Sequence, residues 1–518
     1  MLVRPAWIDG QTVGISLLAA SLILLLSWAA YLAFFHPLAR YPGPWVARFT
    51  NLHSAYHAWI GDIHVDMYRC HEKYGDHVRY APNRLLINTP GAVQDIYSHH
   101  APVKKYRNYR VLAQQAPNTL TMQDKSQHSR RRRVLSQAFS ARSLEAWEPK
   151  MLSQLDRLCQ VIRSHLSPGA SSPETEWTTS LDMARTCKFP LPHFNQLAFD
   201  TMTSVSFDTD FDTLRTPQYR YVMEAIAASN IRLSVLLQAH ELGTANLDRR
   251  LFPSSIAGGS QFVRFIRGLL GKRLKSPGMG TDIFSFLQQC KDPDTGECLS
   301  LTELSTETAT FIIAGSDTTS TTMAAVCHYL TGSRRCYDRV AEEVRSTFAS
   351  LGDIRLGPAL NSCVFLRACI DEALRLSPPS GSSLWREVEG AGACVDGQWL
   401  PAGCEVGVGI YSIHHRAADW PDPFHFHPDR WLQDAPARPY MPFSIGSRSC
   451  IGKPLALAQA MLTLARLFWE FDLRRADGNS EEEGEGEEEE KEYVVADHVT
   501  AGGRGPVLGF RPRIPEGR

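Results

Sequence analysis

The strongest chemical pattern in the sequence is a cysteine framed by glycines, close to the C-terminus. Cys450 lies between Gly446 and Gly452 in the stretch PFSIGSRSCIGKPLALAQAMLTLARLFWEF. A cysteine binds a metal as a thiolate, which needs backbone N–H groups directed at the sulfur and protection from water. Glycines permit the tight turn that this requires, and Pro454 suits the first turn of the apolar helix that follows. We therefore expect Cys450 to ligate a metal.

The flanking residues favour a metal-binding turn over a nucleotide-binding loop. Phe443 is placed to cover the sulfur, and Arg448 adds a cation just before the cysteine. A phosphate loop has four residues between its glycines and a Ser or Thr after its lysine, whereas here five residues separate the glycines and a proline follows the lysine. The sequence contains 12 cysteines, and the other eleven are interpreted as inert side chains.

Two other segments place charged or hydroxyl side chains at helical spacing. Glu372 and Arg375 are three positions apart, so they share one face of a helix and can pair. Pro428 and Arg430 follow before the cysteine. Upstream, ETATFIIAGSDTTSTTMAAVCHYL is an apolar helical run that Gly315 interrupts and hydroxyls crowd, although Thr and Gly both weaken helices. This run is either a Thr-rich core helix or one whose polar side chains serve chemistry.

Taken together, these segments resemble the cytochrome P450 family. The motifs F-x-x-G-x-R-x-C-x-G, E-x-x-R, P-x-R and A-G-x-D-T-T occur in the family's order. The matching positions are Phe443, Gly446, Arg448, Cys450 and Gly452; Glu372 and Arg375; Pro428 and Arg430; and Ala314, Gly315, Asp317, Thr318 and Thr319. The resemblance covers nearly the whole chain as far as Arg513. Stretches such as YPGPW, VLSQAFS and FNQLAFDTM are most similar to fungal microsomal members.

The resemblance implies a cofactor, a fold and a mechanism. The fold would be mainly α with small β-sheets (α+β), preceded by one transmembrane helix. The cofactor would be haem b, with its iron bound by the Cys450 thiolate. In this family the thiolate donates electron density to the iron and favours cleavage of the O–O bond. Asp317 and Thr318 would relay protons to oxygen from a locally widened stretch of helix.

The resemblance also assigns residues around the cofactor. The buried structural triad would consist of Glu372, Arg375 and Arg430. His128, in place of the family's Trp, and Arg132 would contact a haem propionate, as would Arg386, which follows Trp385. The four arginines 130–133 would alternatively form a solvated basic face that docks an acidic reductase. The substrate site would be lined by Ile312, Ala314, the loop Arg110–Met122 and the segment Ser377–Leu384.

The implied activity is insertion of one oxygen atom from O2 into a small, largely apolar organic molecule, by hydroxylation or epoxidation. A membrane-bound NADPH–cytochrome P450 reductase would supply the electrons, because no G-x-G-x-x-G motif follows a plausible strand. Association with fungal relatives suggests secondary metabolism. Three alternatives stay open: a desaturase, isomerase or dehydratase of the same fold, a non-catalytic haem-binding protein, and a hydrolase, although the G-x-S-x-G motif of hydrolases is absent.

The composition argues against nucleic acid as a partner and favours a reducing compartment. Lys and Arg number 54 against 55 Asp and Glu, so the net charge of −1 provides no field for binding nucleic acid. The cysteines form no C-x-x-C pair, which argues against a cysteine zinc site or a disulfide framework. A reducing, cytosol-facing location is the simpler interpretation.

The elements that must position these residues form one large unit behind a membrane anchor. Residues Gly14–Phe35 are uncharged and long enough to cross a bilayer, which favours a transmembrane helix over a cleaved signal peptide. The positive-inside rule then leaves the catalytic part in the cytosol, at the endoplasmic reticulum. We expect an anchor at 1–36, a proline-rich hinge at 37–48 and a catalytic domain at 49–518, with an acidic surface loop at 481–492.

Overall fold

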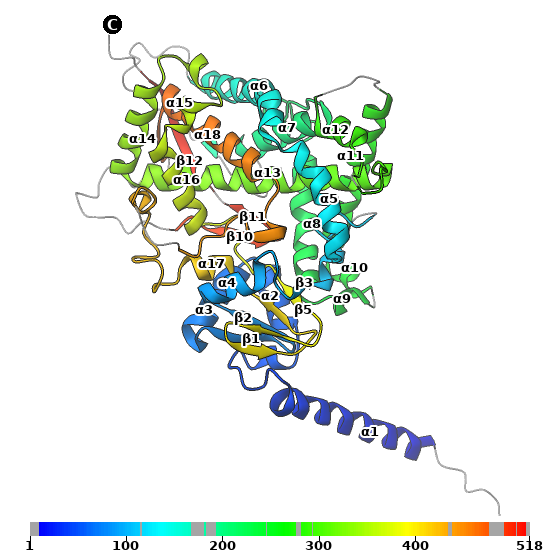
Figure 1. Ribbon diagram of the computed structural model, residues 1–518. Helices are drawn as coiled ribbons and strands as arrows, with labels where there is room; N and C mark the ends of the chain where they lie inside the picture. Colours follow the sequence, from blue (N-terminus) through cyan, green and yellow to red (C-terminus); the bar gives the residue numbers. More distant parts are fainter. Residues whose placement is uncertain are drawn as a thin grey trace, which may run out of the picture.

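In the computed structural model the described residues are 10–113, 116–166, 181–182, 193–244, 246–275, 281–292, 294–433, 438–475, 492–503 and 505–513. Across these ranges the chain is mainly helical with small β-sheets, which confirms the predicted fold class (Figure 1). The predicted acidic loop at 481–492 lies outside the described residues except for Glu492, whose carboxylate accepts a hydrogen bond from the Tyr411 hydroxyl at 2.9 Å.

The helices and strands have the following bounds. The α-helices are α1 (Gly10–Ala30), α2 (Leu52–Ile60), α3 (Ile63–Tyr74), α4 (Pro90–Tyr97), α5 (Lys125–Ala138), α6 (Ala141–His165), α7 (His193–Phe207), α8 (Tyr221–Gln238), α9 (Glu241–Thr244), α10 (Leu247–Leu251), α11 (Pro253–Lys275), α12 (Ile283–Gln289), α13 (Leu301–Gly332), α14 (Arg334–Thr347), α15 (Pro358–Asn361), α16 (Val364–Leu376), α17 (Ile410–His414) and α18 (Lys453–Glu470). The strands are β1 (His77–Ala81), β2 (Arg84–Ile87), β3 (Val103–Lys105), β4 (Leu181–Asp182), β5 (Arg386–Val388), β6 (Ala393–Val395), β7 (Gln398–Leu400), β8 (Glu405–Gly407), β9 (Phe471–Arg475), β10 (Val495–His498), β11 (Thr500–Gly503) and β12 (Val507–Pro512). Short helical turns are η1 (Tyr31–Phe35), η2 (Val46–Arg48), η3 (Arg107–Leu112), η4 (Leu351–Asp353), η5 (Pro428–Trp431) and η6 (Gly446–Arg448).

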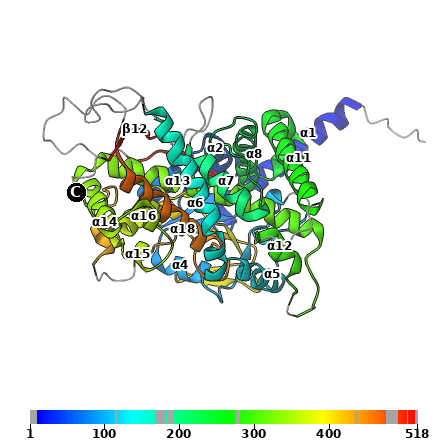
Figure 2. The ribbon, with the colours of Figure 1, turned by 90° about the horizontal axis from the view of Figure 1, so that it is seen from above.

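The body has a larger helical part and a smaller part built on a five-stranded sheet (Figure 1). The sheet has the order β1-β2-β8-β5-β3, so it pairs strands from the two ends of the chain. In the helical part α7, α16 and α18 pack against the long helix α13, and the view from above places this group near the centre (Figure 2). The cysteine loop thus precedes a helix of the central core.

Helix α13 begins at a capping box, in which Ser300 and Glu303 each bond the other's backbone N–H. It runs as a regular α-helix for 32 residues, so the local widening expected near Gly315 is not observed. The glycine is explained by packing instead, because a Cβ at Gly315 would lie 2.5 Å from the Met202 sulfur on α7. Several of the helix's hydroxyls donate to the carbonyl four residues earlier, such as Thr318 to Ala314 at 2.7 Å, and this satisfies polar groups inside an apolar core.

The N-terminal helix projects from the body (Figure 1). Residues Val13–Phe35 form a helical span of 23 residues that contains an unburied 18-residue window with a mean hydropathy of 2.2, which makes it a candidate transmembrane helix. Near its end, Leu32 and Ala33 are buried against the body. The following proline-rich segment packs on the body, since Leu38 and Ala47 are buried and the Arg79 N–H donates to the Pro42 carbonyl at 2.7 Å.

Candidate functional site

The loop before α18 holds Cys450 through its backbone. The Cys450 N–H donates to the Phe443 carbonyl at 2.8 Å, and the Ser449 N–H donates to the Gly446 carbonyl at 3.2 Å. Gly446 has a φ of +68°, and a Cβ at this position would lie 2.1 Å from the Tyr97 carbonyl oxygen. Any side chain would therefore be strained there and would also collide. The loop geometry expected from the glycine spacing is present.

The sulfur of Cys450 meets donors and cations from several elements. The N–H groups of Gly452 and Lys453 donate toward it, and Arg132 acts on it through its charge. Burial raises the pKa of the Cys450 thiol, and these groups oppose that rise. Cys450 is surrounded by protein, but part of its surface is not covered by other residues. This uncovered surface therefore faces a space inside the molecule. This setting suits a sulfur that becomes a thiolate when it binds a metal cation.

Five basic side chains gather beside the cysteine loop: Lys105, His128, Arg132, Arg386 and Arg448. Burial, followed by the charges of Arg386 and Arg448, holds the pKa of Lys105 well below its usual value. Burial and four neighbouring cations lower the pKa of His128 to about 3. Burial together with Arg386 and Arg132 lowers the pKa of Arg448 to about 10. The positive charges here repel one another.

A cavity of about 1130 Å³ lies between these basic side chains. All five basic side chains line it, and no Asp or Glu is among the described residues of its wall. Charges this deep ordinarily have partners of opposite sign. The Arg448 guanidinium is held in place by the carbonyls of Met122 and Gln123, at 2.7 Å and 3.3 Å, which fix its direction without neutralising it. The basic side chains of the wall are therefore suited to binding an anionic group.

These features fit haem. Its two propionates would supply the carboxylates that the cation cluster lacks, and its iron would take the Cys450 sulfur as a ligand. His128 and Arg386, expected from the sequence as propionate partners, lie in the wall of the cavity together with Arg132. Arg132 also donates to the Ser449 hydroxyl at 3.2 Å, which ties α5 to the cysteine loop.

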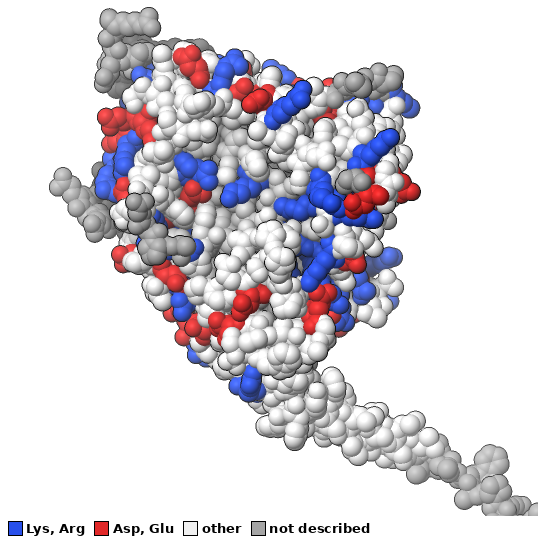
Figure 3. Space-filling view, viewed as in Figure 1, with Lys and Arg blue, Asp and Glu red and all other residues white. Residues whose placement is uncertain are grey.

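The run of arginines 130–133 is not a free basic face. Three of the four pair with acids: Arg130 with Asp292, Arg131 with Glu303 and Glu307, and Arg133 with Asp294. Only Arg132 turns to the cysteine loop. Figure 3 shows the result, with blue and red side chains next to one another over α5. The pairs with acidic residues therefore argue against a solvated basic face, and Arg132 is the member of the run that is placed to contact a propionate.

The three charged residues of the expected structural triad meet in the core. Glu372 accepts two hydrogen bonds from Arg375, at 2.9 Å and 3.0 Å, and one from Arg430 at 3.0 Å. The indole N–H of Trp431 and the His427 N–H also donate to Glu372, at 2.9 Å and 3.1 Å. Burial alone would raise the pKa of Glu372, but the charges of the arginines lower it below the usual value. The carboxylate is ionised and fully paired.

Asp317 and Thr318 point in different directions from α13. Asp317 accepts from the Thr500 hydroxyl at 2.8 Å and from the amides of Asn195 and Asn230 at 3.3 Å and 3.4 Å. Burial raises the pKa of Asp317 to about 6. Thr318 is half-buried and donates to its own helix. The structure thus places the two relay candidates side by side in the chain but on separate faces, since successive helical residues diverge.

A second cavity, of about 620 Å³, lies between α8, α11, α13 and the turn from β10 to β11. Ala314 lines it as expected, but Ile312 does not, because Ile312 is fully buried in the core and Ile313 faces the cavity. The expected loop contributes residues such as Val111 and Leu120. Residues 377–384 are absent from this wall; Ser377 is instead buried against Tyr329, at 2.7 Å between their hydroxyls.

Some contacts could not be predicted from the motifs. Lys105 has no motif around it, and only its place in β3, paired with β5, brings it to Arg386. Asn230 and Thr500 come from α8 and β11, far from Asp317 in the chain. The one available signal was the presence of polar residues in otherwise apolar segments.

The sequence of this chain is similar to a known protein family and to several fungal proteins. The model of the family described as Cytochrome P450 matches residues 41–490. The chain is 45% identical over 511 residues to the cytochrome P450 monooxygenase poxM of Penicillium oxalicum, covering 98% of this chain and 96% of that protein. It is 60% identical over 332 residues to the monooxygenase lcsN of Purpureocillium lilacinum, covering 62% and 98%. It is 41% identical over 502 residues to AKT7 of Alternaria alternata, covering 93% and 94%.

Proposed function

This chain belongs to the cytochrome P450 family, and from that premise we propose that it inserts one oxygen atom of O2 into a small, largely apolar metabolite. P450 monooxygenases are oxidoreductases that bind haem through a cysteine thiolate, and they use O2, a substrate and a redox partner. The observation that carries the assignment is the sulfur of Cys450, which faces an internal space beside a cavity lined only by basic residues among its charged groups.

The residues that would hold haem are Cys450 at the iron and the cation cluster at the propionates. Bound haem would supply the iron centre at which O2 is activated. The N–H groups directed at the sulfur favour its thiolate and offset part of the burial that raises its pKa, and the iron cation would favour the thiolate further. Phe443, Gly446 and Gly452 shape the turn, and the triad around Glu372 anchors the nearby segment that contains Arg430.

Protons for oxygen reduction would come through Asp317 and Thr318. A carboxyl with a pKa of about 6 is part protonated near neutral pH, so Asp317 can both take up and release a proton. Its partners Thr500 and Asn230 line the substrate cavity, which gives protons a route from that side. Transfer to the Thr318 hydroxyl then requires a bridging water or a rotation of the carboxyl group.

The cavity of about 620 Å³ supports a substrate of metabolite size. Its inner wall is apolar around Ile313 and Ala314, so this end suits the hydrocarbon that is oxidised. Two arginines, Arg264 and Arg267, line the cavity from α11 and are exposed. They suit a polar or anionic group at the other end of the substrate.

Electrons would come from NADPH through a membrane-bound P450 reductase. The helix Val13–Phe35 would hold this chain on the endoplasmic reticulum with the catalytic domain in the cytosol. The similar proteins are fungal P450 monooxygenases, which supports a role in secondary metabolism. The proposed domain limits remain an anchor at 1–36, a proline-rich segment at 37–48 and the catalytic domain from 49.

The carbon monoxide difference spectrum of the reduced full-length protein tests the assignment. We expect a thiolate-type spectrum in the wild type and in Cys394→Ala, whose cysteine is exposed elsewhere, and loss of this spectrum in Cys450→Ala. Thr318→Ala should keep the spectrum but consume O2 and NADPH without matching product, whereas Thr322→Ala, one turn away, should stay coupled. A thiolate spectrum in Cys450→Ala would disprove the ligand assignment. Product formed without NADPH would favour an isomerase or dehydratase.

A further inference from the structure

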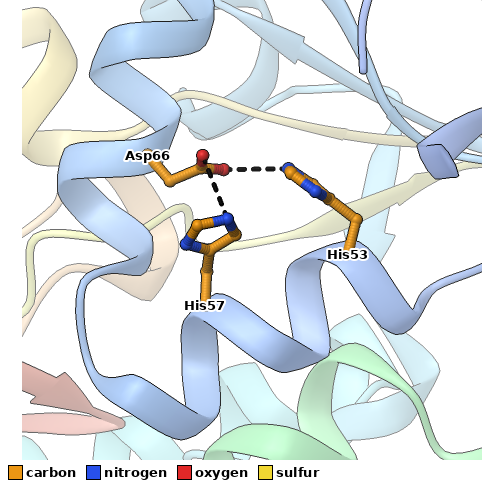
Figure 4. Close-up of side chains that lie close together, drawn as sticks. All are labelled: His53, His57 and Asp66. Carbon is orange, nitrogen blue, oxygen red and sulfur yellow. Dashed lines mark hydrogen bonds and ion pairs between the residues drawn. The ribbon is translucent and has the colours of Figure 1, made fainter. Parts of the chain in front are cut away.

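Three side chains with metal-binding atoms meet on the first two helices of the body, away from the proposed haem site. His53 and His57 lie one turn apart on α2, and both are directed at Asp66 on α3 (Figure 4). Their ligand atoms all lie within 4.8 Å of one another. Among the described residues this is the one group of three or more His, Cys, Asp or Glu side chains with that property. The proposed monooxygenase reaction does not use it.

Two distances between ligand atoms are close to the edge of a tetrahedron around zinc, each to a different oxygen of Asp66. Zinc lies about 2.0 Å from His nitrogen and carboxylate oxygen, so two such ligands are roughly 3.3 Å apart in a tetrahedral site. Nε2 of His53 is 3.0 Å from Oδ2 of Asp66, and Nε2 of His57 is 3.2 Å from Oδ1 of the same carboxylate. Both ligand pairs therefore already have close to the required spacing.

His57 presents both of its ring nitrogens to carboxylates. Nδ1 is 2.7 Å from Oδ1 of Asp62, and Nε2 is 3.2 Å from Oδ1 of Asp66. A neutral imidazole has one N–H, so if Nδ1 donates to Asp62, the lone pair of Nε2 faces the Asp66 carboxylate. Either a proton on Nε2, which makes His57 an imidazolium, or a metal cation between the two groups removes the repulsion between them. Histidines that bind metals typically donate their other N–H to a carboxylate, and Asp62 holds this position.

Asp66 is held in place by a further partner, because its carboxylate accepts a hydrogen bond from the Tyr80 hydroxyl at 2.7 Å. The side chains of His53, His57 and Asp66 are 18%, 18% and 13% exposed, so an ion can reach them from solvent. Two imidazoles and one carboxylate select zinc-like metals over magnesium or calcium, which prefer oxygen ligands.

We propose that His53, His57 and Asp66 bind a zinc ion, with Asp62 and Tyr80 orienting the ligands and water at the fourth position. The ion ties α2 to α3 across the short connection that Gly61 and Asp62 form. Because Nε2 of His53 donates to Asp66 in the metal-free protein, zinc takes the Nε2 lone pair as the imidazole proton moves to Nδ1, and His53 stays neutral. The site stabilises the part of the body that directly follows the membrane anchor and the proline-rich segment.

Zinc titration of the full-length, haem-loaded protein tests this site. After removal of metals by a chelator, calorimetry with zinc chloride should show one zinc bound per chain. His57→Gln and His53→Gln should each weaken binding more than about 100-fold, and Asp62→Asn by about 10- to 100-fold. His165→Gln, which removes an exposed histidine at the end of α6, should bind zinc as the wild type does.

Haem content measured on every variant reports correct folding independently of zinc. If His57 is instead an imidazolium between its two carboxylates, the wild type will bind no stoichiometric zinc, and this result overturns the site. Equal zinc affinity in the wild type and in correctly folded His57→Gln overturns it as well. Neither outcome affects the haem assignment, which depends on a different region.

Discussion

Two clusters of buried charge in this protein differ in one respect: one is paired within the chain and the other is not. In one cluster, the Glu372 carboxylate accepts hydrogen bonds from two arginine side chains, an indole N–H and a backbone N–H. Around the cavity beside the cysteine loop, Lys105 and Arg448 meet other cations and carbonyls but no carboxylate among the described residues of the wall. The first cluster is complete when the chain folds, whereas the second is complete only with an anionic cofactor. The comparison separates residues that stabilise the fold from residues that bind a ligand.

The largest effect is expected from breaking the paired cluster. Glu372→Ala leaves the guanidinium groups of Arg375 and Arg430 in the core without a counter-charge, which should cost about 3–5 kcal/mol of the free energy of unfolding. Denaturant unfolding of the purified protein measures this loss, and a large drop in yield would accompany it. Asp338→Ala removes an exposed partner of Arg334 and should cost under about 1 kcal/mol. If Glu372→Ala and Asp338→Ala lowered the free energy of unfolding by similar amounts, the paired cluster would not have the stabilising role assigned to it.

A smaller effect is expected from removing one cation of the unpaired cluster. The change should not destabilise the apoprotein, but it should weaken haem binding. In Lys105→Met the apoprotein should be at least as stable as the wild type, because a cation repelled by Arg386 and Arg448 is removed. The haem-loaded protein should lose haem about 10-fold faster, because one charged partner of the propionates is gone. Transfer of haem to an apoglobin acceptor measures the rate. Lys73→Met, which removes a surface lysine over the Tyr74 ring, is the matched control for Lys105 over Tyr109 and should change neither property.

The smallest effect is a pH dependence of the apoprotein. His128 has a pKa of about 3 when folded, below the ordinary value of 6.5, so below pH 6.5 the unfolded chain binds a proton that the folded chain does not. The free energy of unfolding is therefore lost as the pH falls, by about 1 kcal/mol between pH 6.5 and 5.5 for this residue. His128→Gln should abolish that part of the loss in the apoprotein.

Haem should reduce the same effect, because propionates beside His128 would raise its pKa toward the ordinary value. His414 provides the contrast: burial and Arg375 also lower its pKa to about 3, but it lies beside the paired cluster, away from the cavity. Its contribution should remain in both forms. Unfolding curves of the wild type and His128→Gln, with and without haem, measure the difference; an unchanged acid response on haem loading would contradict the placement of the propionates near His128.

The motif residues whose partners are near in sequence were the ones that could be predicted in detail. Gly446 is fixed by a positive φ within its own turn, and Glu372 and Arg375 meet because a helix places them on one face. Arg430 was expected as the third member from the resemblance, and the structure brings it to Glu372. The resemblance did not reveal that Trp431 and the His427 N–H complete the pairing.

Predictions that depended on the direction of a side chain were less successful. Ile312 and Ile313 are adjacent and chemically identical, and only the rotation of α13 against its neighbours decides which faces the cavity. The same rotation turns Asp317 to Thr500 and away from Thr318. Gly315 was interpreted as a widening of the helix, whereas it makes room for Met202 on α7.

The sequence by itself determined the membrane-span candidate and the cysteine turn, because hydrophobic patterning and short-range backbone preferences act between residues that are close in the chain. The fold class followed from the resemblance of its motifs to a known family. Only the tertiary structure decided which buried charges are paired. Lys105 reaches Arg386 through pairing of β3 with β5, and His53 and His57 reach Asp66 through packing of α2 on α3. Electrostatic energy depends on distance in space, so its consequences emerge when remote segments come together.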